Sequence, residues 1–141
     1  MKTYSHTQSG SLIIGMMLFL FVILFLLGVF VLKPFLLTAP LILLVTWIFH
    51  SLTIEITDRE LCWRFGPGLI SKRVALAEIA SVKIVRTHFL DGWGIHFSRF
   101  GWLYNVSGYD AVVITLRNGK GFALGTDEPE GLLAKLSAPQ I

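Results

Sequence analysis

The chain has 141 residues, of which 54% are hydrophobic and 15% are charged, and its formal net charge is +3. Ten of the twelve Lys and Arg and all nine Asp and Glu lie after residue 50, so this second part carries a net charge of only +1. It has no basic stripe and no nucleic-acid-binding motif, and we expect no nucleic-acid partner. The single cysteine, Cys62, excludes an internal disulfide and is typical of a reducing compartment.

Two apolar runs stand back to back near the start of the chain. The first, residues 12–32, has no charged residue, and as a helix it would be roughly 30 Å long, the thickness of a bilayer's hydrocarbon core. Lys33 and Pro34 interrupt the pattern before the second run, residues 35–50. We therefore predict a two-helix transmembrane hairpin over residues 11–50. The start of its second helix, at Phe35 or nearer Ala39, stays open.

The distribution of basic residues predicts the orientation of this hairpin. Lys2 precedes the first run, several Lys and Arg follow the second, and the intervening turn carries only Lys33. By the positive-inside rule, an N-terminal tail of residues 1–10 and the part after residue 50 both lie in the cytoplasm, as in a multi-pass membrane protein. Ser11 and Gly15 form a small-xxx-small pair, which leaves a homo-oligomer open.

The remaining residues alternate between apolar and polar side chains, which is typical of strands with one buried face. Such strands are expected near residues 52–57, 61–65, 69–76 and 79–86, then at 110–116 and 121–125 on either side of an Asn-Gly turn. The stretch 88–107 is irregular and rich in aromatic residues. A short helix follows, begun by an expected capping box of Asp127 and Glu130 and ended before Pro139.

Three motifs carry a resemblance to a known family: WGIH at 93–96, GWLYNVSG at 101–108 and GTDEPE at 125–130. With the apolar runs, they resemble small bacterial membrane proteins in which a transmembrane hairpin precedes one pleckstrin-homology-like (PH-like) domain. The resemblance covers residues 11–137. It implies that residues 51–141 form a mainly β PH-like barrel of six to seven antiparallel strands with a C-terminal capping α-helix. It also implies the bacterial inner (cytoplasmic) membrane as the location.

The first hairpin of the domain departs from phosphoinositide-binding PH domains. Those domains resemble one another in a basic cluster there, whereas residues 57–60 hold one base between two acids. We therefore do not expect inositol-phosphate recognition.

The sequence offers no constellation of catalytic or metal-binding residues. His88, Asp91 and His96 do not have the spacing of a zinc site. Ser98 and Ser107 are not in a nucleophile elbow. We expect no enzyme activity, no metal and no cofactor.

Two groups of residues are the candidates for binding a partner or lipid. The aromatic stretch could form a surface or fill the core, and the basic strand could face anionic lipid or plain solvent. The candidate residues are Trp93, His96, Arg99, Trp102 and Tyr104 in the first group, and Lys72 and Arg73 in the second.

The expected function is therefore a membrane-anchored, non-enzymatic binding module at the cytoplasmic face. Its partners would be the lipid bilayer and a protein of unknown identity. The alternative is a domain that binds anionic lipid headgroups, or senses the membrane surface, through the basic strand residues and the aromatic stretch.

Overall fold

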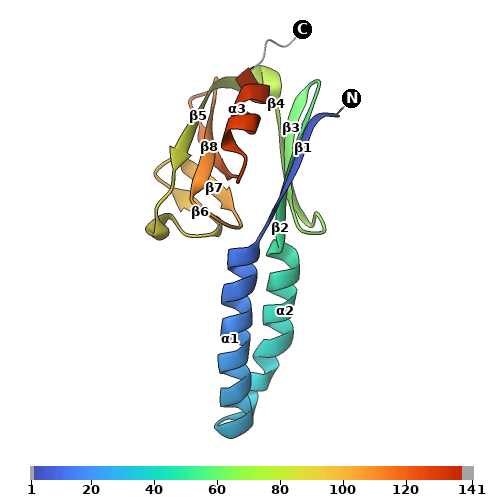
Figure 1. The fold of residues 1–141 in the computed structure, drawn as a ribbon, viewed down its shortest axis with the longest axis vertical. Helices are drawn as coiled ribbons and strands as arrows, with labels where there is room; N and C mark the ends of the chain where they lie inside the picture. Colours follow the sequence, from blue (N-terminus) through green and yellow to red (C-terminus); the bar gives the residue numbers. More distant parts are fainter. Residues whose placement is uncertain (1, 138–141) are drawn as a thin grey trace.

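A computed structural model describes residues 2–137, with 3-10 helices labelled η. The elements in chain order are β1 (Lys2–Ser9), α1 (Ser11–Phe30), η1 (Lys33–Leu37), α2 (Thr38–Phe49), β2 (Ser51–Thr57), β3 (Glu60–Phe65), β4 (Ile70–Ala75), η2 (Leu76–Glu78), β5 (Ile79–Arg86), η3 (Phe89–Asp91), β6 (Gly94–Ser98), β7 (Gly101–Asn105), β8 (Asp110–Leu116), β9 (Gly121–Gly125) and α3 (Pro129–Ser137). A β domain stands at one end, and α1 and α2 project from it as a stalk (Figure 1).

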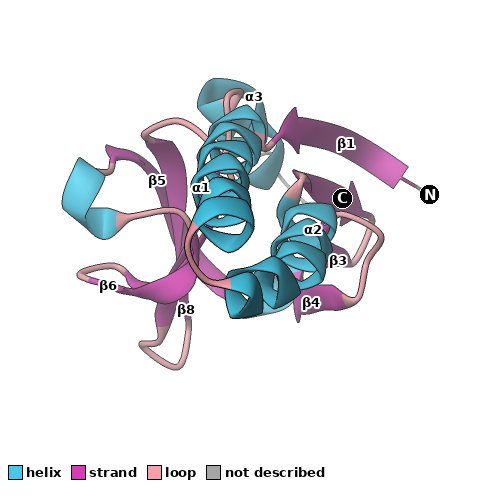
Figure 2. Cartoon of the chain, turned by 90° about the horizontal axis from the view of Figure 1, so that it is seen from below, coloured by secondary structure: helices cyan, strands magenta, loops and turns pink. Residues whose placement is uncertain are grey.

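Over the described residues the strands form two sheets. The first has the order β1-β2-β3-β4 and the second the order β5-β8-β9-β7-β6. Neighbouring strands are antiparallel except for β7 and β9, which are parallel. Seen along the stalk, α1 and α2 lie between the strands of the first sheet and those of the second (Figure 2).

The main core lies between the sheets, because the alternation in β2 and β3 turns every second side chain inward. Trp63 and Phe65 of β3 contribute rings to this core, and Trp63 stacks on Phe122 of β9 with 4.7 Å between ring centroids. The helix α3 contributes Leu132, which is fully buried, and packs against β1, β5 and β8. The C-terminal helix that the sequence predicts is thus present.

The expected capping box at the start of α3 is absent from these residues. The Asp127 carboxylate instead contacts the His6 ring of β1, and the Thr126 hydroxyl accepts a hydrogen bond from the Glu128 amide at 3.0 Å. A long-range tie to β1 therefore replaces the local cap.

The expected two-helix transmembrane hairpin is wrong. Within residues 2–137 one helix, α1, is long and apolar enough to cross a membrane. The second apolar run begins instead as the 3-10 helix η1, with Pro34 in its first turn, and Pro40 falls in the first turn of α2. A proline is tolerated only in a helix's first turn, so two of them break the run. The 12 residues of α2 rise only about 18 Å.

The expected barrel of six to seven antiparallel strands is also wrong, because the described strands form two sheets of four and five. Two of the additional strands, β6 and β7, lie in the stretch that the sequence suggests is irregular. A third, β1, lies in the expected tail of residues 1–10 and pairs with β2. The expected strands after residue 50 and the Asn-Gly turn are present.

The pairing of β1 with β2 fixes both ends of the stalk at one end of the domain. Ser9 lies opposite Ser51, and the Gly10 amide donates to the His50 carbonyl at 2.7 Å. Gly66, which follows β3, joins them: its amide donates to the Ser51 carbonyl at 2.9 Å. We call Gly10, His50 and Gly66 the neck. Glycine is required at two of its positions, since a Cβ would lie 2.7 Å from the Phe49 carbonyl oxygen at Gly10 and 2.6 Å from that of Ile48 at Gly66.

Candidate functional site

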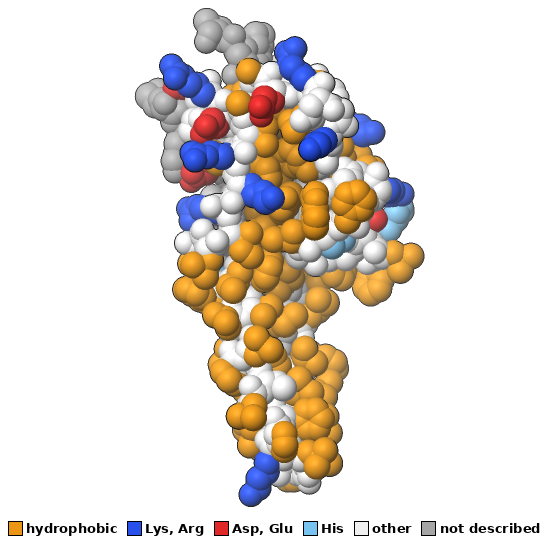
Figure 3. Space-filling view, turned by 180° about the vertical axis from the view of Figure 1, so that it is seen from behind, with side chains coloured by type: hydrophobic (Ala, Val, Ile, Leu, Met, Phe, Trp, Pro, Cys, Tyr) orange, Lys and Arg blue, Asp and Glu red, His pale blue; other side chains and the backbone are white. Residues whose placement is uncertain are grey.

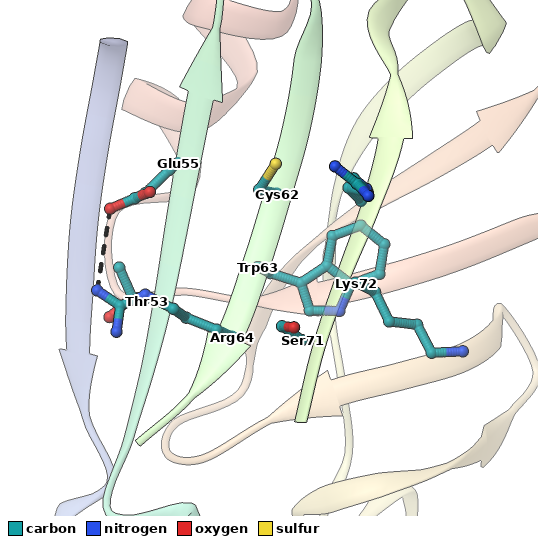
Figure 4. A pocket seen from close by; sticks show the side chains of 8 residues that line it. Thr53, Glu55, Cys62, Trp63, Arg64, Ser71 and Lys72 are labelled. Atoms are coloured by element: carbon teal, nitrogen blue, oxygen red, sulfur yellow. Dashed lines mark ion pairs between the residues drawn. The ribbon is translucent and has the colours of Figure 1, made fainter. Parts of the chain in front are cut away.

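The outward face of the first sheet carries a groove of about 360 Å³ (Figure 4). Strand register builds it in two rows. One row runs from Thr53 through Arg64 to Ser71, and the next from Glu55 through Cys62 to Arg73. These side chains are outward because the alternate positions of β2 and β3 are occupied by core residues. The groove is lined by Thr53, Glu55, Cys62, Trp63, Arg64, Ser71, Lys72 and Arg73, and we use this name for that set.

The charges in the groove are mostly positive. Arg64, Lys72 and Arg73 face a single carboxylate, Glu55, in the lining. The Arg64 Nη2 to Glu55 Oε1 distance is 4.0 Å, the dashed line in Figure 4. Across residues 2–137, Lys72 and Arg73 make no ion pair. The groove therefore offers two basic side chains to an acidic group.

Cys62 sits in the middle strand of this groove. Burial raises the pKa of the Cys62 thiol, Glu60 and Glu55 raise it further, and Arg73 lowers it in part. The thiol form is thus favoured at neutral pH, and the side chain acts there as a weak polar group and not as a thiolate.

Trp63 lies under the groove and is 3% exposed. Its Nε1–H has no hydrogen-bond partner among the described residues, although a buried indole N–H usually finds one. Lys72 is its register partner on β4, so both side chains stand on the same face of the sheet. Figure 4 shows them on the β4 side of the groove.

An aromatic row continues from Trp63 across to the second sheet. Trp63 stacks on Phe122, Phe122 lies opposite Trp102 in the β7–β9 pair, and Trp102 meets Phe97 edge to face at 6.0 Å. Exposure rises along the row, from 3% at Trp63 and 7% at Phe122 to 50% at Trp102 and 74% at Phe97. Seen from behind, hydrophobic side chains run between the sheets and down onto the stalk, with Lys and Arg around them (Figure 3).

The structure separates the predicted site residues. Lys72 and Arg73 come together in the groove, and Trp102 lies at the exposed end of the aromatic row. Tyr104 is 4% exposed and belongs to the core. Trp93 is half-buried, and its Nε1–H donates to the Gly108 carbonyl at 3.1 Å, so the ring packs against the core and holds a turn.

His96 and Arg99 lie elsewhere on the second sheet. His96, on β6, faces Leu103 of β7, and its Nε2 is buried without a hydrogen-bond partner in the described part of the chain. Arg99 lies over the Phe100 ring at 4.7 Å and 3.7 Å from the Asp91 carboxylate. The guanidinium is thus already engaged within the domain.

Sequence reasoning missed most of the groove. Thr53, Glu55, Cys62, Arg64 and Ser71 join Lys72 and Arg73 only through strand register. The sequence did contain a signal for them. The polar residues that alternate with apolar ones in β2 and β3 could have been paired across the predicted hairpin, which would have placed them on one face.

No group of three or more His, Cys, Asp and Glu side chains within residues 2–137 is arranged to hold a metal ion. The expectations of no cofactor and no enzyme activity stay predictions.

No protein-family model, no curated protein and no solved structure matches this chain. The resemblance to small bacterial PH-like membrane proteins therefore finds no support beyond one apolar helix near the N-terminus and a mostly β domain. The groove and the stalk are the features from which a function can be argued.

Proposed function

We propose that this protein is a membrane-anchored, non-enzymatic binding module that presents the groove to an acidic segment of a protein partner. In this proposal α1 is the anchor in a bacterial inner membrane, and the β domain lies on the cytoplasmic side. The observation that carries the proposal is the groove itself, whose lining brings three basic side chains, Arg64, Lys72 and Arg73, together with a single carboxylate, Glu55.

Support for the anchor comes from the surface of α1. The helix has apolar side chains on all sides, yet only 11% of its most apolar 18 residues are buried. A helix that is hydrophobic all round needs an apolar surrounding. Within the described chain, Ile13 and Met17 near the start of α1 pack against the domain core, and its main other neighbours are α2 and η1. A bilayer supplies that surrounding.

Support for a protein partner comes from the edge of the first sheet. β4 is an edge strand in the described part of the chain, so one side of its backbone has no neighbouring strand. Extended peptides bind such edges by adding a strand, and the side chains beside the edge select the sequence. Lys72 and Arg73 lie on this strand and favour Asp or Glu.

Anionic lipid headgroups are the alternative ligand for the same basic residues. Along β3, Cys62 lies three residues before Phe65, which adjoins the neck residue Gly66. At about 3.3 Å per residue, the row of Cys62 and Arg73 is about 10 Å farther from the stalk than Phe65. This spacing favours a partner in solution over the membrane to which the stalk is attached.

The test is recovery of a partner by the full-length protein from native membranes in mild detergent. We expect the wild type to recover an acidic protein in a salt-sensitive way, and K72E/R73E to lose at least about tenfold of it. K83E/K120E, which makes the same charge change on the second sheet, is the matched control and should retain the partner.

Recovery of no specific protein by the wild type, or equal recovery by K72E/R73E, would contradict the proposal. Loss of a co-purified anionic lipid, with no protein lost, would favour the alternative.

A further inference from the structure

Three apolar side chains at the stalk end of the β domain are exposed. Leu69, in the turn between β3 and β4, is 67% exposed; Phe89 and Leu90, in η3, are 69% and 94% exposed. Single exposed apolar residues are ordinary, so their position decides whether they matter. We call Leu69, Phe89 and Leu90 the apolar rim.

Contacts at the neck place Leu69 beside the end of α2. The turn begins at Gly66, whose amide donates to the Ser51 carbonyl, and a Cβ on Gly66 would lie 2.7 Å from the Trp47 carbonyl oxygen. Trp47 itself is 52% exposed on the last turn of α2. Indole rings are favoured at the boundary between headgroups and acyl chains, so Leu69 lies close to the level at which that boundary is expected.

A second set of contacts places η3 beside the start of α1. The Ser11 and Ser107 hydroxyls are 3.3 Å apart, and the next residue, Gly108, accepts the Trp93 indole N–H. Phe89 packs edge to face on Trp93 with 5.5 Å between centroids. In Figure 1, η3, the short turn between β5 and β6, and the β3–β4 turn both lie at the stalk end of the domain, on opposite sides of the stalk.

The only carboxylate of η3 is turned toward the protein. Asp91 accepts a hydrogen bond from the His88 amide at 2.7 Å and lies 3.7 Å from Arg99. Arg86, at the end of β5, adds a basic group just before the turn. An apolar tip with its acid neutralised and a base beside it has the composition of an interfacial segment that enters an anionic membrane surface.

We propose that the apolar rim inserts into the headgroup region of the membrane that holds α1, so that the domain rests on the bilayer on both sides of the stalk. The proposal rests on the membrane anchorage in the proposed function. The lipid surface is the chosen occupant because the rim is continuous with the stalk. The β3–β4 turn begins at Gly66 against the end of α2, and η3 is linked through Trp93 and residues 107–108 to the start of α1. The rim holds the domain close to the surface, and the row of Cys62 and Arg73 in the groove lies about 10 Å farther from the stalk than Phe65.

The test uses the full-length protein in liposomes of phosphatidylethanolamine and phosphatidylglycerol, with and without bromine on the acyl chains. An environment-sensitive thiol label is attached at L69C or L90C in a C62A background. Phe19, 70% exposed in the middle of α1, provides the anchor control as F19C. N118C, in the turn after β8 and about 20 Å of strand away from Asp110, provides the solvent control.

We expect brominated lipid to lower the fluorescence of the L69C and L90C labels by about twofold, because side chains of interfacial segments reach about 5–10 Å into the membrane. The N118C label should be unchanged, and the F19C label should be quenched most. Aqueous iodide should show the reverse order.

The controls separate the two ways in which the proposal can fail. Quenching at F19C with none at L69C and L90C overturns the rim and leaves the anchor standing. No quenching at F19C overturns both. Labels at L69C and L90C that are shielded from iodide but not quenched by lipid would show that protein covers the rim, and this also overturns the proposal.

Discussion

The two sheets bury their faces differently. In the first sheet, the inward positions of β2 and β3 are buried and the outward positions carry Thr, Glu, Cys and Arg. In the second sheet, β8 has four consecutive buried residues, 111–114, because a second apolar cluster covers its outer face. A strand buried on both sides has no face left for a partner. The first sheet thus offers a surface, and the second supports it.

The largest effect on stability is expected in the second apolar cluster, on the outer face of the second sheet. Leu103 is fully buried in the outer cluster, so L103A should lower the free energy of unfolding by about 2–5 kcal/mol. Ser71 is exposed in the groove, and S71A should change it by less than about 0.5 kcal/mol. Denaturant unfolding of the full chain in detergent, followed by tryptophan fluorescence, measures both. Similar changes in the free energy of unfolding for L103A and S71A would contradict the proposed difference between the two sheets.

A smaller effect on stability is expected for the hydrogen bond between β1 and Glu128, the residue that precedes α3. The Tyr4 hydroxyl donates to Glu128 Oε2 at 2.8 Å, so Y4F should cost about 1 kcal/mol of unfolding free energy. Tyr109 has no such bond among the described residues, and Y109F is the control. The same unfolding assay at neutral pH compares them, and equal costs for Y4F and Y109F would show that the tie contributes nothing.

The tie at Tyr4 also predicts a pH dependence. Burial, and then the bond to Glu128, raise the pKa of Tyr4 above its ordinary value of 10.0. Above pH 10 the unfolded chain releases this proton while the folded chain keeps it, so the wild type should lose stability as pH rises further. Y4F should lose less over the same range when unfolding is measured between pH 9 and 11. A parallel decline in both proteins would contradict the assignment.

The smallest effect concerns reactivity and not stability. Burial raises the pKa of Cys62, and among the neighbouring charges Glu60 raises it and Arg73 lowers it. E60Q should therefore speed alkylation of Cys62 at pH 8, and R73Q should slow it, each by about two- to threefold. Iodoacetamide rates on the folded protein test the opposite signs. A shift of both rates in the same direction would mean that access, and not charge, controls this thiol.

Alternation in the sequence predicted the strands well where one face is buried and the other polar. The residues of β2 and β3 follow that pattern, and the change to helical spacing predicted α3. The pattern fails for β1, whose inward residues Tyr4, His6 and Gln8 are amphipathic or polar. This strand exists because β2 offers an edge and Glu128 and Asp127 offer partners, and all of these are distant in sequence.

The site was only partly predictable for a similar reason. Lys72 and Arg73 were identified from local charge, but their neighbours Cys62 and Glu55 are set by register between strands. The number of aromatic residues could not separate Tyr104, which is core, from Trp102, which is half exposed. Nor did the apolar composition of the second run show that it would form the 3-10 helix η1 and the 12-residue helix α2 in place of one membrane-spanning helix.

The pairing of β1 with β2 also has a consequence for the order of events during synthesis. β1 leaves the ribosome before the apolar segment, but its partner β2 follows only after some 40 residues, which takes roughly 2–8 s at typical rates. During that interval β1 has no sheet to join, because its neighbour in the first sheet is β2. The first sheet can therefore close only after α1, η1 and α2 have been synthesised, and its completion brings the two ends of the stalk together.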